Sequence, residues 1–452
     1  MDRLVATGTK LDEPFRPLME GAPVQRTTII GLGLLALLGC TPATAADLST
    51  TIASMTEPAQ GAYTFLHEHP ELGKKEFKAQ TYLEDALKQF GFTEFIASTE
   101  APTAVIAILD SGRPGPTIAL RAEMDARPLE RNAVEPTSHM PRSQIDGLMH
   151  NCGHDIHASI LLGTAGILIA NKERFSGKIV FLFQPAEETP GGADDIVHEK
   201  ILERLGVKAI FAEHVAPGMP IGTIGIAPDF ALAGSNYFHL KIKGRGSHAA
   251  APNEGSDTPL VAARMAIELS EYPARHLDIA NKPVVISVTQ FLADGNAGNV
   301  IPADADVSGT IRSFENISLG ENGEPSLEQK LDLLVSRMAS EAGVNYDWAV
   351  RPGAPATRND PALFEQIIAP LGRTWPGMLD THPGRGMFSE DFSYYTGVMP
   401  ALYFSIGVSK DGRGLAGVHT KEFDAHPDIF AHGLRLMTTL AVIGTAGKMD
   451  WQ

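Results

Sequence analysis

The chain has 452 residues, of which 43% are hydrophobic and 20% are charged, a profile that excludes a disordered or fibrous protein and provides core for two or three domains. Its formal net charge is −17, with acidic residues spread along the chain and no run of Lys and Arg. We therefore expect no nucleic-acid partner, because such a surface concentrates positive charge.

Residues 1–45 are predicted to form a leader with a secretory or lipoprotein signal. The apolar segment Thr27–Leu38 follows Arg26; it is too short to span a bilayer but suits the core of a secretory signal. Cleavage after the small-x-small sequence Ala43–Ala45 would release a soluble protein, whereas Leu37–Cys40 resembles a bacterial lipobox that would place a lipid anchor on Cys40. The leader predicts a secreted or periplasmic protein, either soluble or anchored to the membrane as a lipoprotein.

Residues 46–231 are predicted to form the first part of an α/β domain. Apolar residues recur at helical spacing over 51–90, in two segments, and over 159–170. Runs rich in β-branched residues predict strands at 103–109, 117–120, 178–183 and 208–211. Because these strands alternate with helices, we expect a mainly parallel central sheet flanked by helices, with its chemistry at the carboxyl ends of the strands.

The pattern changes over residues 232–345, which we interpret as an inserted α+β domain. Strands are expected at 237–243, 283–288 and 306–312, and helices at 258–269 and 326–342. Residues 346–452 return to the first pattern and are predicted to complete the α/β domain, with helices at 361–371 and 427–446 and a buried strand at 401–406.

The segment His150–His157 is the densest group of potential metal ligands, with one thiol and three imidazoles within eight residues. Gly153 between Cys152 and His154 allows a sharp turn, so that sulfur and imidazole can converge on one ion. The alternatives are a cysteine protease, whose Cys and His normally lie far apart in sequence, and a structural histidine cluster at a helix start. If Cys40 is removed or modified, Cys152 has no disulfide partner, and metal ligation would protect its thiol.

Carboxylates and imidazoles also follow several predicted strands. These residues are Glu187 and Glu188 after 178–183, His214 after 208–211, His419 after 401–406, and Asp125 after 117–120. Each alone would be an exposed loop residue or a structural residue. Because carboxyl ends of parallel strands meet at one edge, we expect the side chains to converge. Of two adjacent glutamates, one can bind a metal while the other acts as a general base, and Asp125 can orient a ligating imidazole.

Together these segments resemble the M20 metallopeptidase family, in the amidohydrolase and carboxypeptidase branch that includes auxin-conjugate hydrolases, hippurate hydrolases and N-acyl-amino-acid amidohydrolases. The resemblance covers about residues 55–445. It rests on segments in the family's order: 121–127, 150–157, 184–188, 213–215, 244–249, 299–302 with 309–312, 388–392, and 418–419.

The resemblance implies two divalent metal ions per subunit, Zn or Mn, with Co or Ni as alternatives. The implied ligands are Cys152, which would bridge the ions, with His154, Glu188, His214 and His419. Glu187 would be the general base, and Asp125 would orient a ligand, namely His154. A thiolate, imidazoles and a carboxylate suit such first-row ions, while the ion's identity does not follow from the donors.

The resemblance also implies that the insert is a lid and dimerisation domain, through which the chain forms a homodimer. His248 would reach an active site, often that of the partner subunit, and polarise the scissile carbonyl. Asn299 and Arg312 would bind the free carboxylate of the substrate, for which a planar guanidinium is suited. The chain departs from the family pattern at Glu123, Arg127, Asn151 and Asn253; none of these is an implied metal ligand, but Arg127 and Asn253 leave the substrate preference open.

The sequence therefore predicts a metal-dependent amidohydrolase whose small-molecule substrate is an N-acyl amino acid or a similar compound with a free carboxylate. A metal-activated water would attack the amide. The alternatives are a dipeptidase or carboxypeptidase acting on short peptides, a thiol hydrolase using Cys152 and His154, and a binding protein of the same fold without turnover.

Overall fold

The computed structural model describes residues 48–320, 323–446 and 449. The predicted leader, including Cys40 and both processing sites, lies outside these residues. Within the described part of the chain, no helix has the length and apolar character needed to cross a membrane.

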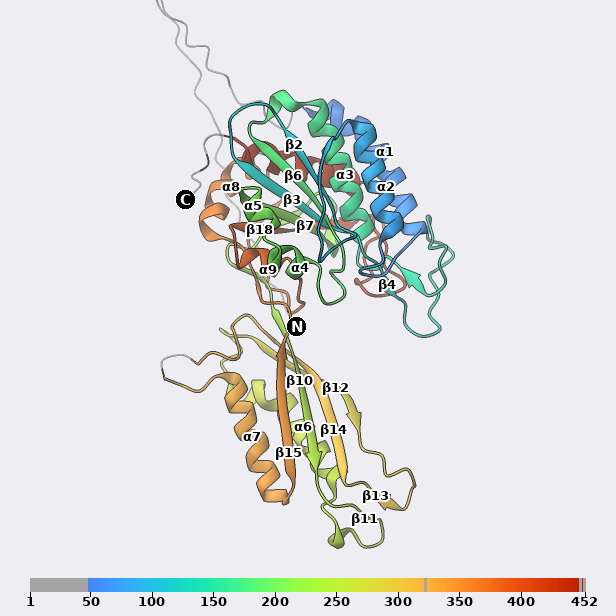
Figure 1. Cartoon of the computed structure of the whole chain (residues 1–452), viewed down its shortest axis with the longest axis vertical. Coiled ribbons are helices and arrows are strands. Elements are labelled where there is room, and N and C mark those ends of the chain that lie inside the picture. Colours follow the sequence, from blue (N-terminus) through green and yellow to red (C-terminus); the bar gives the residue numbers. More distant parts are fainter. Residues whose placement is uncertain (1–47, 321–322, 447–448, 450–452) are drawn as a thin grey trace, which may run out of the picture. The chain divides into compact units, whose positions relative to one another are not determined.

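The main sheet has eight strands within the described residues, in the order β1-β2-β6-β3-β7-β18-β8-β17 (Figure 1). Their bounds are β1 Glu94–Ile96, β2 Val105–Asp110, β3 Thr117–Glu123, β6 Lys178–Gln184, β7 Val207–Pro220, β8 Ile224–Gly225, β17 Leu379–Asp380 and β18 Ala401–Ser409. The central strands β6, β3, β7 and β18 are parallel, whereas β1 and β2 add antiparallel pairs at one edge. The predicted mainly parallel sheet is confirmed.

Helices cover both faces of this sheet, as the continuous apolar runs of its strands require. Adjacent residues of β3 show this: Leu120 belongs to the core on one face and Ala119 to the core on the other. The first face carries α1 Ser49–Glu68, α2 Phe77–Phe90, α3 His154–Ala170, α8 Pro361–Thr374 and α10 Ile429–Gly444. The second face carries α4 Ala193–His198, α5 Ile201–Arg204 and α9 Ser393–Thr396.

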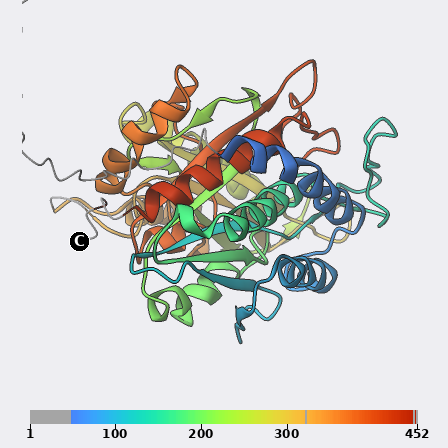
Figure 2. The same ribbon diagram turned by 90° about the horizontal axis from the view of Figure 1, so that it is seen from above.

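Helix α3 lies at the centre of the first layer. It contacts α1 and α10 on either side and the sheet beneath, and Figure 2 shows α1 in blue and α10 in red alongside it. Every residue from His154 to Leu168 is buried, which explains why the helix is apolar around its whole circumference. The helix begins at His154, five residues before the predicted start at 159, so residues 154–157 of the predicted metal-binding motif form its first turn and Cys152 precedes it.

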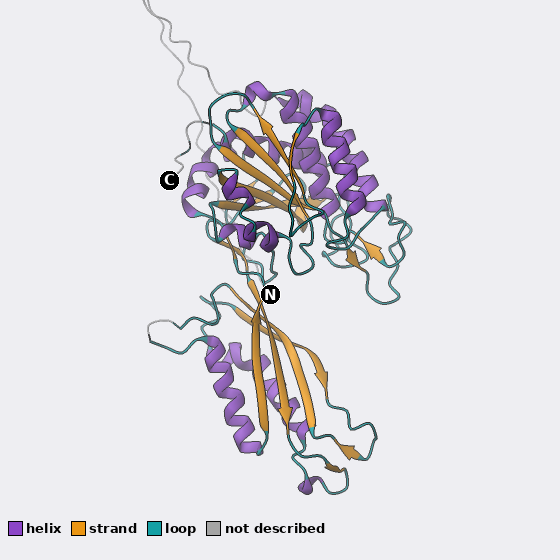
Figure 3. Ribbon diagram, in the orientation of Figure 1, coloured by secondary structure: helices purple, strands orange, loops and turns teal. Residues whose placement is uncertain are grey.

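The segment after residue 233 forms a second sheet with the order β12-β14-β10-β15. Its elements are β10 Gly234–Lys243, α6 Thr258–His276, β12 Val284–Leu292, β14 Asp304–Ser313, α7 Leu327–Ala342 and β15 Asn345–Pro352. The helices lie on one face of the sheet (Figure 3) and share a separate apolar core with it. We expected the insert to end at 345, but β15 pairs along β10 as far as Asn236 with Pro352, so this sheet continues for one more strand.

Short strand pairs connect the loops around the two sheets. They are β4 Arg127–Pro128 with β5 Leu148–Met149, β9 Phe230–Leu232 with β16 Thr357–Arg358, and β11 Ser247–His248 with β13 Val300–Ile301. In the first pair Arg127 lies opposite Met149. This pairing fixes the loop after β3 directly beside the start of the His150–His157 segment.

Candidate metal centre

The turn before α3 places Cys152 and His154 on the same side of the chain. Gly153 adopts a left-handed conformation with φ of +86°, which an L side chain rarely adopts. A Cβ atom there would also lie 2.6 Å from Val215 Cγ2. Both backbone conformation and space therefore require glycine between the two potential ligands.

Cys152, His154 and Glu188 each offer a ligand atom within 4.8 Å of the others. His154 donates from Nδ1 to the carbonyl oxygen of Asp125 at 3.0 Å and to its carboxylate Oδ1 at 3.1 Å. These contacts occupy Nδ1 and leave Nε2 as the ring nitrogen that can bind an ion. Nε2 is buried and has no hydrogen-bond partner, so it is available to an ion.

Glu188 and His419 approach this group from two different loops. Glu188 Oε1 is buried without a hydrogen-bond donor aligned on it and lies 3.2 Å from His419 Nε2. The backbone N–H of Glu188 donates to Asp125 Oδ2 at 3.0 Å, and the backbone N–H of His419 donates to the carbonyl of Asn151 at 2.6 Å. Asp125 therefore holds both His154 and Glu188, while the Cys152 turn holds His419.

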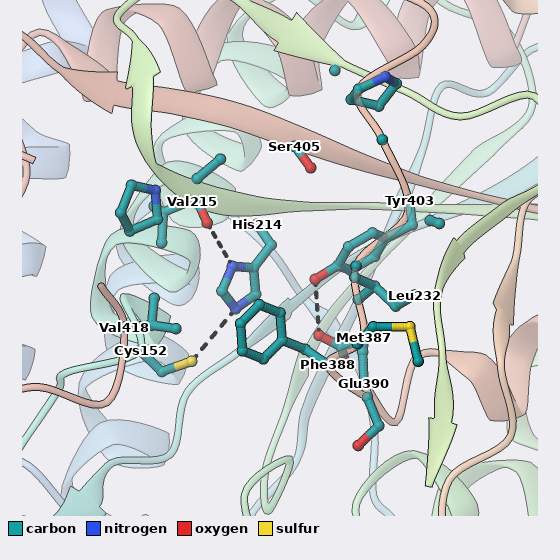
Figure 4. A pocket seen from close by; sticks show the side chains of 18 of the residues that line it. Cys152, His214, Val215, Leu232, Met387, Phe388, Glu390, Tyr403, Ser405 and Val418 are labelled. Carbon is teal, nitrogen blue, oxygen red and sulfur yellow. Dashed lines mark hydrogen bonds between the residues drawn. The ribbon is translucent and has the colours of Figure 1, made fainter. Parts of the chain in front are cut away.

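His214 lies within β7 rather than after it, because β7 continues to Pro220 alongside β18. The pairing of β7 with β3 ends earlier, at Arg121 with Ala212, so His214 still lies at the carboxyl end of the central sheet. Its Nδ1 donates to the carbonyl of Val215 at 2.9 Å, and its Nε2 lies 3.5 Å from Cys152 Sγ (Figure 4). Sulfur thus lies between His214 and the other potential ligands.

The environment of Cys152 favours its thiolate. Burial raises the pKa of the thiol, but His154 and His214 beside it lower that pKa to about 6. A thiolate is the form that binds metal. Ligands that share an ion at about 2.0 to 2.3 Å lie about 3 to 4 Å apart, so Cys152, His154 and Glu188, whose ligand atoms lie within 4.8 Å of one another, could hold a metal ion.

Two histidines of the motif have other roles. His157 donates from Nδ1 to Glu123 Oε2 at 2.9 Å and accepts the backbone N–H of Val215 at Nε2, at 3.0 Å. Although His157 lies near His154 and His214 in space, both of its ring nitrogens are used, so it serves structure rather than ligation. His150 is also buried, and burial lowers its pKa to about 4, so it is neutral at pH 7.

Beside the candidate ligands lies a buried network of hydrogen bonds around an arginine, which the sequence did not predict. Arg121 is fully buried and donates to Gln184 Oε1 at 2.8 Å, Glu390 Oε1 at 2.9 Å and Asp391 Oδ1 at 2.6 Å, and it also pairs with Glu123. The network joins β3, β6 and the loop before α9. The only signal for it in the sequence is a charged side chain in the otherwise apolar strand of residues 117–122.

Glu187 lies against this network. Its Oε1 is 3.4 Å from the backbone N–H of Asp391, and its carboxylate lies within 4.8 Å of those of Glu390 and Asp391. Burial raises the pKa of Glu187 well above its ordinary value, and the charges of Glu390 and Asp391 raise it further. A carboxylate with increased proton affinity is suited to remove a proton from water.

A cavity of about 670 Å³ opens onto these groups, and its lining includes Cys152, Glu187, Glu188, His214 and His419. Phe388 and Met387 also line it, and Figure 4 shows Phe388 beside His214. Tyr237 and Arg312 of the second sheet also line it, and Arg312 Nη1 donates to Ser389 Oγ at 2.5 Å. Arg312 is therefore brought to the cavity.

His248 and Asn299 are not brought to this cavity. Both are exposed and lie together, with the backbone N–H of Ala249 donating to the carbonyl of Asn299 at 2.9 Å. Neither belongs to the cavity lining. Within a single chain, the catalytic role predicted for His248 and the substrate contact predicted for Asn299 have no structural counterpart.

A second buried charge cluster, also absent from the sequence reasoning, fixes α1 to α3. His67 Nδ1 lies 2.6 Å from Asp155 Oδ2, and His67 Nε2 lies 3.0 Å from Glu135 Oε1. Burial alone would lower the pKa of His67, but the two carboxylates raise it to about 9. The imidazole is therefore charged at neutral pH and supports the residue next to His154.

The sequence model of Peptidase family M20/M25/M40 matches residues 119–442. The chain belongs to this family. Among M20 relatives, it is 34% identical to an N-acyl-L-amino acid amidohydrolase of Geobacillus stearothermophilus, over 73% of this chain and 86% of that protein. It is 32% identical to thermostable carboxypeptidase 1 of Saccharolobus solfataricus, over 83% of this chain and 93% of the relative.

A solved M20 structure gives the same result. The fold matches that of a Bacillus subtilis protein described as a dinuclear metal-binding peptidase of the M20 family, with a TM-score of 0.72 and 26% identity over 87% of this chain and 99% of that chain. The predicted family is confirmed, and the chain is a metal-dependent hydrolase of the M20 amidohydrolase and peptidase type.

Proposed function

We propose that this M20 hydrolase cleaves the amide bond of N-acyl amino acids that carry a free carboxylate. The observation that carries the proposal is a pair of buried ligand atoms beside the buried carboxylate of Glu187: His154 Nε2, which has no hydrogen-bond partner, and Glu188 Oε1, which lies 3.2 Å from His419 Nε2. Ligand atoms of His154 and Glu188 lie within 4.8 Å of each other and next to a candidate base. This arrangement suits hydrolysis by an activated water. The likeness to an N-acyl-L-amino acid amidohydrolase supports the choice of substrate.

Cys152, His154, Glu188, His214 and His419 would hold two divalent ions, with Cys152 between them. The donor set is one thiolate, three imidazoles and one carboxylate, which favours Zn or Mn, with Co or Ni as alternatives. Asp125 would act by orienting His154 and Glu188, through the hydrogen bonds described above.

Bound divalent ions would supply Lewis acidity, lowering the pKa of water and polarising the scissile carbonyl. Glu187 accepts a proton from the attacking water. It then donates this proton to the leaving amine, so that the carboxylate is regenerated in each cycle. Arg121 pairs with Glu390 and Asp391 in this cluster, so that the charges next to Glu187 are partly compensated.

Arg312 would bind the free carboxylate of the substrate, since it lines the same cavity and can present two parallel N–H groups. We propose that Asn299 and His248 complete a site in the partner subunit of a homodimer. Their exposure and their place at the β11–β13 pair, outside the cavity that Arg312 lines, support this arrangement. The exposed apolar residues Phe291 and Leu292 at the end of edge strand β12 also support it.

We further propose that the protein is secreted or periplasmic, either soluble or anchored through a lipid on Cys40. The apolar segment and the two processing sequences of the leader support this location. The mass of the N-terminal peptide of the mature protein tests it, because signal cleavage near Ala46, lipidation at Cys40 and an intact leader give three different masses.

The function is tested by assaying the metal-loaded enzyme against N-acyl amino acids, their carboxyl methyl esters, and dipeptides. We expect turnover of the free acids, loss of turnover on esterification, and loss on chelation with recovery on adding the ion. Activity that survives chelation but not iodoacetamide would establish a thiol hydrolase instead. A preference for dipeptides would favour the second candidate, a dipeptidase or carboxypeptidase, which the likeness to the Saccharolobus enzyme supports.

A further inference from the structure

Arg127 places a guanidinium beside the metal ligands, inside the cavity. Its Nη1 donates to Glu188 Oε2 at 2.5 Å and lies 3.2 Å from His419 Nε2. The side chain is 32% exposed and lines the cavity together with these residues. The pairing of β4 with β5 fixes its backbone opposite Met149.

The contacts of Arg127 with Glu188 and His419 involve only Nη1 of the guanidinium. Arg127 contacts Oε2 of Glu188, whereas the oxygen that faces the other candidate ligand His419 is Oε1. Among the described residues, the Nε and Nη2 groups of Arg127 have no hydrogen-bond partner. A guanidinium has five N–H donors in a fixed plane, so most of the donors of Arg127 remain available to a molecule in the cavity.

The charge balance of the cavity favours an anion there. Its lining holds two arginines, Arg127 and Arg312, and three glutamates. Of these glutamates, Glu390 is already paired with Arg121, and Glu187 and Glu188 are assigned to the base and an ion. Two divalent ions would add positive charge next to Arg127. An anionic group is the partner that relieves this repulsion while accepting the free N–H donors.

We propose that Arg127 determines specificity by binding a second anionic group of the substrate, so that the preferred substrates are dianionic N-acyl amino acids. One carboxylate would be the one assigned to Arg312, and the other would belong to the acyl group or to the amino-acid side chain. This inference rests on the proposed function, because it assigns the same cavity to the same class of substrate.

Matched substrate pairs test the proposal on either side of the amide. One pair is the dianion N-succinyl-alanine with its monoanionic succinamoyl counterpart, and the other is the dianion N-acetylglutamate with monoanionic N-acetylglutamine. In the wild-type enzyme we expect kcat/KM to favour the dianionic member of at least one pair by about tenfold to a hundredfold, the range of a charged hydrogen-bonded contact. Arg127→Leu should lower this ratio to near one, and Arg127→Lys should leave an intermediate ratio.

Arg131→Leu is the matched control, because Arg131 is exposed on the following loop and lies outside the cavity lining; it should keep the wild-type ratio. Metal content is measured for each variant. If Arg127→Leu loses metal, or if it lowers both members of each pair equally, Arg127 acts only through Glu188 and the proposal is wrong.

Calorimetry separates this inference from the proposed function. Succinate should bind the metal-loaded wild-type protein at least tenfold more tightly than succinamate, and Arg127→Leu should abolish this difference. If no acyl amino acid is hydrolysed, the proposed function fails, yet the calorimetric comparison still decides whether Arg127 selects a second anion. An unchanged difference in Arg127→Leu would overturn the assignment.

Discussion

His154 Nδ1 lies 3.1 Å from Asp125 Oδ1, with both side chains fully buried. This hydrogen bond sets the direction of the only unpartnered nitrogen of His154. Asp125 also accepts the backbone N–H of Glu188 through its other oxygen. One carboxylate therefore positions two potential ligands that come from different segments of the chain.

We predict that Asp125→Ala lowers metal affinity about 10- to 100-fold, the usual cost of losing a group that orients a ligating imidazole. Competition with a chromophoric chelator measures the affinity. Asp146→Ala is the control, because Asp146 is exposed in a loop and its replacement should leave the affinity unchanged. Equal affinities of Asp125→Ala and the wild type would show that His154 and Glu188 need no such support.

Replacing Glu187 should affect turnover, whereas replacing the adjacent Glu188 should affect metal binding. Glu187→Gln keeps the shape of the side chain but removes its ability to accept a proton, so it should retain metal and lose about 10²- to 10⁴-fold in kcat. Glu188→Ala removes the buried Oε1 from the ligand group, so it should lose bound metal. Elemental analysis and turnover of the same preparations separate these outcomes, and near-full activity of Glu187→Gln would remove it from the mechanism.

The proximity of Glu187, Glu188 and Asp125 was predictable because parallel strands bring their carboxyl ends together. The sequence placed Glu187, Glu188 and Asp125 directly after strands, and those strands are neighbours in the sheet. The Arg121 cluster was not predictable in this way. Its partner Asp391 is 270 positions away in the chain, and only the packing of α9 against the sheet brings them together.

The sequence pattern also does not reveal contacts made by segments that are only partly buried. β15 alternates exposed and half-buried residues and has no apolar run, so its own sequence does not reveal that it pairs with β10. The sequence shows His67 only as a polar residue near the end of a helix. Its buried ion pairs could not be predicted, because its partners Glu135 and Asp155 lie 68 and 88 positions away. Such clusters require knowledge of which helices pack together.

Gly153→Ala should damage the site more than a typical glycine replacement. The added Cβ would occupy a left-handed conformation and lie 2.6 Å from Val215 Cγ2. Gly112→Ala is the matched control, since Gly112 has φ of +73° but open space around it. We expect about 1 kcal/mol of destabilisation for Gly112→Ala from backbone strain alone and about 1 to 3 kcal/mol more for Gly153→Ala.

Chemical denaturation of both glycine variants measures these differences, and metal titration reports the geometry of the Cys152 turn. Weaker metal binding is expected only in Gly153→Ala. If both variants were equally stable and bound metal equally, the contact with Val215 would not constrain the turn.

The His67 cluster predicts a pH-dependent contribution to stability. The folded-state pKa of His67 is about 9, raised from an ordinary value of 6.5. Below pH 6.5 the imidazole is charged in both the folded and unfolded chains, so its stabilisation is fully present. As pH rises towards 9 the unfolded chain no longer binds this proton, and the stabilisation is progressively lost. The shift corresponds to at most about 3 kcal/mol.

The His67→Gln variant isolates this contribution. We expect the wild type to exceed His67→Gln in unfolding free energy at pH 6, and the difference to shrink by pH 9.5. Urea denaturation of metal-free protein at both pH values measures it without interference from pH-dependent metal binding. His276→Gln, which alters an exposed histidine, should show no such change with pH. A difference for His67→Gln that stays constant between pH 6 and 9.5 would mean that the imidazole does not hold an extra proton in the folded protein.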